Sequence, residues 1–81
     1  MTERRDRLLA SKPAAVAAKD AFTSRYAAGR RDRTVGLGLN RSGEDWAVKV
    51  FVHSESAASE LPAQFGNFDV EVQVTGAAKA L

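Results

Sequence analysis

Residues 34–53 read TVGLGLNRSGEDWAVKVFVH, and this stretch predicts two consecutive strands. Apolar residues alternate with others through 34–40 and again through 46–53, which is typical of half-buried strands. A polar turn around Gly43 joins the two segments. Because the connection is short, we expect the two strands to form an antiparallel hairpin.

Residues 68–75, FDVEVQVT, alternate in the same way and predict a third strand that ends at Gly76. Between the second and third strands, residues 54–60 suit a short helix with Ser54 as its N-cap. Residues 61–65 are expected to form a compact turn that tucks apolar groups under the sheet. The order of the strands is left open, because the third can lie beside either of the others.

The segment before the hairpin predicts a helix over residues 13–28, which are rich in alanine. Pro13 suits the first helical turn, and Ser11 is the expected N-cap. Gly29 stands where a left-handed C-cap would end the helix. At 100° per residue, Phe22 falls on the alanine-lined face that should be buried.

These elements predict one α+β domain over residues 13–81, preceded by a charged, frayed or mobile segment over residues 1–12. The expected order is α-β-β-α-β. Each strand has one apolar face, so the fold is predicted to be a two-layer sandwich, with a three-stranded sheet carrying helices on one face.

Composition narrows the class of protein. The chain has 81 residues, of which 44% are hydrophobic and 27% charged, as in globular domains. It has no cysteine, which rules out a disulfide framework or thiolate site and fits a reducing compartment. No apolar run approaches the length of a membrane span or a secretory signal. We therefore expect a cytoplasmic protein with no membrane contact.

Charge is unevenly spread along the chain. Residues 1–33 hold nine basic and four acidic side chains, a net +5, whereas residues 34–81 hold three and six, a net −3. Four arginines cluster where the first predicted helix ends: Arg25, Arg30, Arg31 and Arg33. Cations at that end suit the helix dipole, which is a structural explanation for them. The functional alternative is that these arginines contact the phosphates of a nucleic acid.

One face of the predicted hairpin carries an apolar outlier. Phe51 lies on the face expected to be polar, between Lys49 and His53, and Gly36 and Gly38 share that face on the neighbouring strand. An exposed aromatic beside side-chain-free positions favours a contact surface. We predict a non-enzymatic module that uses its open sheet face or edge to bind a protein partner or to form a homo-oligomer.

Other chemistry finds little support in the sequence. The pair Gly36 and Gly38 lacks the third glycine of a nucleotide-binding loop, where Arg41 stands, and a hairpin rather than a helix follows. His53 with Glu55, Asp69 and Glu71 has no spacing that demands a metal ion or supports catalysis. We expect no cofactor, no metal and no catalytic residues.

The second half of the chain resembles a small bacterial domain of unassigned function that is sometimes found just before a trypsin-like peptidase domain. The matching features are Val35-Gly-Leu-Gly38, the turn at Gly43, Trp46-Ala-Val-Lys-Val50, Leu61-Pro62, Phe65-Gly66, Val70-Glu-Val72, Gly76 and Ala80-Leu81. The resemblance implies an αββαβ two-layer fold, akin to ferredoxin-like or peptidase-prodomain-like sheets. It implies no protease activity, since the chain has no room for a Ser-His-Asp triad.

Overall fold

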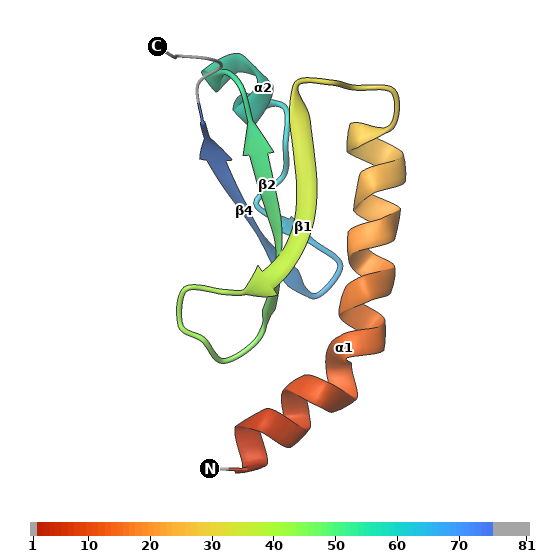
Figure 1. Cartoon of the computed structure of the whole chain (residues 1–81), viewed down its shortest axis with the longest axis vertical. Helices are drawn as coiled ribbons and strands as arrows, with labels where there is room; N and C mark the ends of the chain where they lie inside the picture. Colours follow the sequence, from red (N-terminus) through yellow and green to blue (C-terminus); the bar gives the residue numbers. More distant parts are fainter. Residues whose placement is uncertain (1, 76–81) are drawn as a thin grey trace.

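A computed structural model describes residues 2–75 and shows an α+β fold in two layers (Figure 1). Gly76 and the tail that follows it lie outside the described residues. The elements in chain order are α1 (Thr2–Phe22), the π-helical segment η1 (Thr23–Ala27), β1 (Arg33–Leu39), β2 (Trp46–Val52), α2 (Glu55–Ser59), β3 (Gln64–Phe65) and β4 (Phe68–Val74). No helix within residues 2–75 combines the length and the apolar character that crossing a bilayer requires.

The sheet is mixed, and β2 lies inside it. The strand order is β1-β2-β4-β3, with β2 antiparallel to β1 and parallel to β4. Parallel strands cannot be joined by a tight turn, so the chain crosses over between them and carries α2 on the way. The order that the sequence leaves open is thereby resolved: β4 lies beside β2 and not beside β1.

The sheet formed by the described residues has four strands, so the expectation of three is wrong. The extra strand is β3, which pairs Gln64 with Asp69 and Phe65 with Phe68 in an antiparallel hairpin. It occupies the stretch expected to be a compact turn. Two residues are too few to show an alternating pattern, and this is why the sequence gives no sign of the strand.

The core lies between the helices and one face of the sheet. The register places Val35, Val50 and Val72 side by side across three strands. The buried cluster draws on both helices and two strands: Phe22, Val48, Val50, Val52, Ala57 and Val70. Since residues of α1 and α2 meet the same strand face, both helices cover one side of the sheet, as the alternation predicts.

Helix α1 begins at Thr2 and runs through Pro13, so the helix start predicted at Pro13 is wrong. Proline removes one helical hydrogen bond and bends the helix, and Figure 1 shows the bend. Contacts with the hairpin hold the first turns in place. The Trp46 indole N–H donates to the Leu8 carbonyl at 2.8 Å, and Arg7 donates to the Glu44 carbonyl at 2.8 Å. Whether residues 1–12 are mobile in solution stays a prediction.

The last turn of the first helix is widened into the π-helical segment η1. Thr23 Oγ1 donates back to the Lys19 carbonyl at 2.8 Å, a bond that competes with regular helix geometry. Gly29, with φ of 75°, then turns the chain toward β1, as its position predicts. Tyr26 packs on Phe22 with ring centroids 4.8 Å apart, so the widened turn still contributes to the core.

Replacing Phe22 with alanine should lower the free energy of unfolding by about 3–5 kcal/mol, because the ring is fully buried between Tyr26 and Phe65. Urea unfolding followed by Trp46 fluorescence gives this quantity. The matched control is Phe51→Ala, whose ring is 40% exposed; we expect a loss below about 1 kcal/mol there. Equal losses in the two variants would contradict the assignment of the core to the helical side.

Candidate protein-interaction surface

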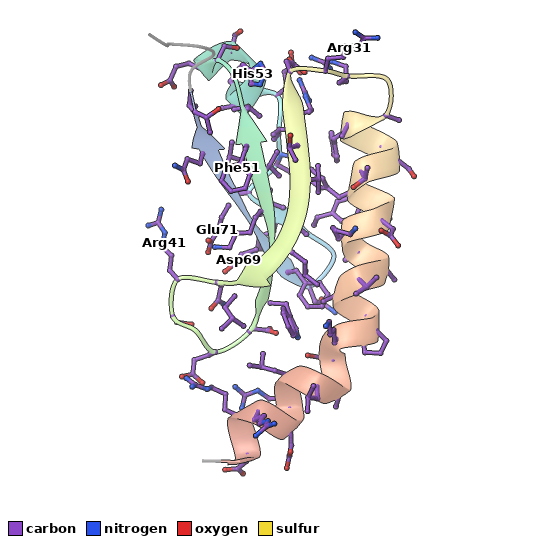
Figure 2. All side chains as sticks on the ribbon, in the orientation of Figure 1. Arg31, Arg41, Phe51, His53, Asp69 and Glu71 are labelled. Atoms are coloured by element: carbon purple, nitrogen blue, oxygen red, sulfur yellow. The ribbon has the colours of Figure 1, made fainter. Side chains whose placement is uncertain are left out.

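The sheet face that points away from the helices carries a shallow hollow of about 600 Å³. The side chains that shape it are Arg41, Lys49, Phe51, Glu71 and Gln73, around the bare backbone of Gly36. Figure 2 shows Phe51, Glu71 and Arg41 on the side of the sheet opposite α1. We call this hollow and the residues around it the outward face.

Alternation along the strands positions the first group of these residues. Gly36 pairs with Lys49 across β1 and β2, and Lys49 pairs with Glu71 across β2 and β4. Phe51 follows Lys49 by two residues, so its ring projects from the same face. The structure thus brings together Gly36, Lys49 and Phe51, which the sequence assigns to one surface.

An ion pair crosses the middle of this face. Lys49 Nζ contacts Glu71 Oε1, and the other oxygen of Glu71 accepts the backbone N–H of Arg41 at 3.0 Å. The hydrogen bond from Lys49 holds the pKa of the Glu71 carboxyl below its ordinary value, with a further contribution from the Arg41 N–H. Glu71 therefore stays ionised and paired near neutral pH.

Gly38 has a steric reason to be glycine. A Cβ added there would stand 3.1 Å from Cε and 3.3 Å from Cγ of Lys49, so the lysine stem crosses the strand at this point. The sequence predicts that a side-chain-free position would let another group approach closely, and at Gly38 that group is Lys49. Gly36 differs, because no atom of residues 2–75 lies within 4 Å of the corresponding position.

Arg41 is the residue of this surface that sequence reasoning misses. It lies in the loop between β1 and β2, where Asn40 Oδ1 accepts from Ser42 Oγ and from the Glu44 N–H, and where Gly43 has φ of 75°. The Arg41 side chain is exposed and makes no ion pair among the residues that the structure describes. Nothing in the sequence of a polar loop signals that it curls over one face of a sheet.

His53 lies apart from the hollow. His53 follows the end of β2, and its side chain is exposed. The backbone N–H of His53 donates to the Asp32 carbonyl at 3.0 Å. Figure 2 shows it at the opposite end of the sheet from Arg41. Within residues 2–75, no group of three or more histidine, aspartate or glutamate side chains is arranged to hold a metal ion.

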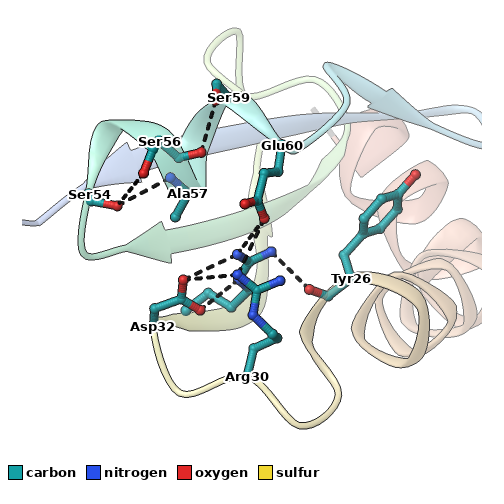
Figure 3. Close-up of polar contacts among 9 residues, drawn as sticks. Tyr26, Arg30, Asp32, Ser54, Ser56, Ala57, Ser59 and Glu60 are labelled. Atoms are coloured by element: carbon teal, nitrogen blue, oxygen red, sulfur yellow. Dashed lines mark hydrogen bonds and ion pairs between the residues drawn. The ribbon is translucent and has the colours of Figure 1, made fainter.

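The arginines proposed for phosphate contact divide into different environments. Arg33 is 1% exposed at its side chain. Its Nε donates to Asp32 Oδ1 at 3.0 Å, its Nη1 to the Tyr26 carbonyl at 3.0 Å, and its Nη2 to Glu60 Oε1 at 2.9 Å. Figure 3 labels the three residues that accept these hydrogen bonds. A buried guanidinium needs such partners, and these leave it none of the exposure that phosphate contact requires.

The other three arginines surround this buried group. Arg30 is half exposed and contacts Asp32 at 3.2 Å and Glu60 at 3.3 Å, so two carboxylates compensate its charge. Arg25 lies over the Tyr26 ring at 5.6 Å. Arg31 is exposed in the loop before β1, as Figure 2 shows. The basic end of the chain therefore offers less free positive charge than its sequence indicates.

The ion pairs with Arg33 lower the pKa values of the Asp32 and Glu60 carboxyls. The hydrogen bonds from Arg33 lower the pKa of the Asp32 carboxyl from its ordinary 3.8 to about 2. They also hold the pKa of Glu60 below its ordinary value. Each carboxyl is thus more acidic in the folded chain than in the unfolded one, which couples the stability of the fold to pH.

Comparison of the chain with protein-family models, with curated proteins and with solved structures found no match. The resemblance to a peptidase-associated domain therefore stays a prediction.

The Asp32 contribution to stability should be complete above about pH 4 and should disappear as the pH falls through about 2. Urea midpoints measured across this range should fall toward low pH in the wild type and fall less in Asp32→Asn. The matched control is Asp6→Asn, which removes an exposed carboxylate that makes no ion pair within residues 2–75. A control that flattened the profile as much as Asp32→Asn would contradict the role given to the Arg33 ion pairs.

Proposed function

We propose that this domain is a non-enzymatic module that binds a protein partner through its outward face. The observation that carries the proposal is the hollow, which no residue within 2–75 covers and in which Phe51, 40% exposed, stands beside the open backbone of Gly36. The partner presents an apolar side chain next to a carboxylate, in a segment extended enough to lie across the strands.

The apolar half of this recognition rests on Phe51 and Gly36. Aromatic side chains dominate the energetics of protein interfaces when they are desolvated by a partner. Gly36 leaves the backbone bare next to the ring, with open space where a side chain would project. An incoming apolar side chain can therefore reach the strand surface and cover one side of the ring.

The charged half rests on Arg41. Lys49 and Glu71 compensate each other, whereas the exposed Arg41 guanidinium has no carboxylate partner among the described residues. A guanidinium forms paired hydrogen bonds with a carboxylate, which gives geometric specificity as well as affinity. The combination favours a partner segment that carries an aspartate, a glutamate or a terminal carboxylate beside its apolar anchor.

The same groups are poorly suited to catalysis. An acid or base catalyst works best when its pKa lies near the working pH. The ion pair with Lys49 moves the pKa of Glu71 in the opposite direction, and His53 lies away from the hollow. These features support a binding role for the outward face.

Nucleic-acid binding through the basic end is the alternative, and it has less support. This alternative requires four arginines to contact phosphate, but Arg33 is buried and Arg30 is paired with two carboxylates. Arg25 and Arg31 keep the exposure needed to reach a phosphate. Two cations give only a small salt-dependent affinity, because the effect scales with the number of phosphates neutralised.

A selection of random linear peptides displayed on phage tests the proposal directly. Recovered peptides should carry an aspartate or glutamate close to a large apolar residue. Fluorescence anisotropy with such a peptide should show at least about tenfold weaker binding to Phe51→Ala and to Arg41→Ala, or about 1.4 kcal/mol for each. The control is Val74→Ala, a substitution outside the residues that line the hollow. Peptides that bind all three variants as tightly as the wild type would show that the outward face is the wrong surface.

A further inference from the structure

The outer edge of β1 is a second open surface. β1 is the last strand of the sheet on its side, paired with β2 and with no strand beyond it in the described part of the chain. Figure 1 looks onto this edge, with β1 drawn in front of the other strands. Natural proteins commonly guard such edges with charges, prolines or bulges. Residues 34–39, TVGLGL, contain no charge and no proline.

The pairing with β2 fixes which backbone groups point outward. The His53 N–H donates to the Asp32 carbonyl, and these two residues lie directly opposite each other when the β1–β2 register is continued by one pair. In antiparallel strands, residues alternate between bonding the partner strand and pointing away from it. Thr34, Gly36 and Gly38 therefore bond β2, and the N–H and C=O groups of Val35 and Leu37 face outward.

We propose that a second copy of this chain pairs with this edge, with its β1 antiparallel to the first and Gly36 on the two-fold axis. Val35 then lies opposite Leu37 of the second copy, and Leu37 opposite its Val35, so the outward groups of both residues find partners. Only apolar side chains and glycines meet at the centre of the pair. The inference rests on the proposed function in that it treats the domain as an interaction module, but it uses a different surface.

The position of α1 fits this pairing. Helix α1 contacts both β1 and β2. An axis midway between these strands would lie about one strand spacing, 4.8 Å, from the two-fold axis. The two copies of α1 would run antiparallel on the same side of the joined sheet. Their axes would be about 10 Å apart, at the upper end of the 8–10 Å separation of packed helices. The edge can therefore pair without a collision between helices.

The side of α1 that would meet its copy carries an exposed apolar group. Ala15 and Phe22 point toward the sheet. In Figure 1, α1 runs upward with the sheet on its left, so a right-handed turn of 100° directs the next residue toward the viewer, on the side of the free edge. By helical spacing Val16, which follows Ala15 by 100°, lies on that flank, and it is 36% exposed.

The midpoint of β1 lies at the same height along the molecule as Val16 of α1. Arg33, at the start of β1, bonds the Tyr26 carbonyl, and Trp46, which pairs with Leu39 at the end of β1, bonds the Leu8 carbonyl. The midpoint of β1 at Gly36 is thus level with the midpoint of residues 8–26, next to Val16. The two-fold axis through Gly36 therefore passes close to Val16 of both copies.

Charge along the same stripe is complementary to itself. Lys12 and Asp20 stand about one turn before and after Val16, and Asp20 is exposed. An antiparallel copy centred on Val16 brings Lys12 of one chain toward Asp20 of the other at both ends of the contact. A parallel arrangement would instead place like charges together.

Cysteine cross-linking tests this register, because the natural chain has no cysteine. Gly36 is placed opposite itself as a pair without hydrogen bonds, whose Cα atoms stand about 4.5 Å apart, within the range of a disulfide. Gly36→Cys should therefore form covalent dimers under mild oxidation, and the added Cβ meets nothing within 4 Å in the monomer. The control is Thr34→Cys, on the same face of β1; two copies of residue 34 would be about 13 Å apart and should not cross-link. Cross-linking of Thr34→Cys in preference to Gly36→Cys would overturn the register.

Sedimentation equilibrium tests the helix contact. Val16→Lys places two cations together at the two-fold axis and should weaken dimerisation at least about tenfold. Val74→Lys is the matched control, since Val74 is 37% exposed but lies on β4, and it should dimerise like the wild type. A wild-type chain that stays monomeric up to high micromolar concentration would falsify the inference. Such a result would leave the outward face untouched, because peptide binding there depends on Phe51 and Arg41.

Discussion

One buried guanidinium links the end of the first helix, the loop before β1 and the end of α2. Arg33 lies at the start of β1 and bonds the Tyr26 carbonyl at the end of the first helix, Asp32 in the loop, and Glu60 at the end of α2. A buried charge is tolerated only when its donors are satisfied, so these three segments are fixed relative to one another and to the sheet. The same segments carry the apolar core that places both helices on one face. Within residues 2–75, the hairpin loop is the segment that reaches over the opposite face.

Local sequence patterns predict much of this arrangement. The three long strands, the short helix capped by Ser54, and the turns at Gly29 and Gly43 all follow from alternation and cap chemistry, because each depends on neighbouring residues. The exceptions depend on distant contacts. Helix α1 continues through Pro13, and Trp46, far along the chain, bonds its Leu8 carbonyl, a contact that no local pattern predicts. Strand β3 forms by pairing with the edge of β4. Two residues are too few to show an alternating pattern, so the sequence does not predict this strand.

The candidate surface divides in the same way. Strand alternation places Lys49 and Phe51 together on one face, so this part of the surface follows from the sequence. Arg41 does not, since a loop residue has no periodicity to orient it. For Arg33 the sequence is misleading in the opposite way. The run of arginines predicts that Arg33 is exposed, whereas the folded chain buries it against Glu60, 27 residues away. Charge counts along a chain do not separate free cations from paired ones.

The two glycines of β1 bring the arguments about face and edge together. A glycine inside a strand costs stability, about 0.5–1 kcal/mol relative to alanine, and needs a compensating reason. Gly38 has one within the monomer, because the Lys49 stem crosses it. Gly36 has none: its φ is not among the positive values found at the turn glycines, and open space surrounds its missing Cβ. Close approach by another chain is the remaining reason that strand geometry offers. A partner segment lying over the outward face would bring backbone or side chain against this residue, so the glycine left unexplained by the monomer is the point at which that partner would meet the chain. Pairing at the edge of β1 runs through the same residue but leaves its Cβ position clear, because side chains project perpendicular to the sheet.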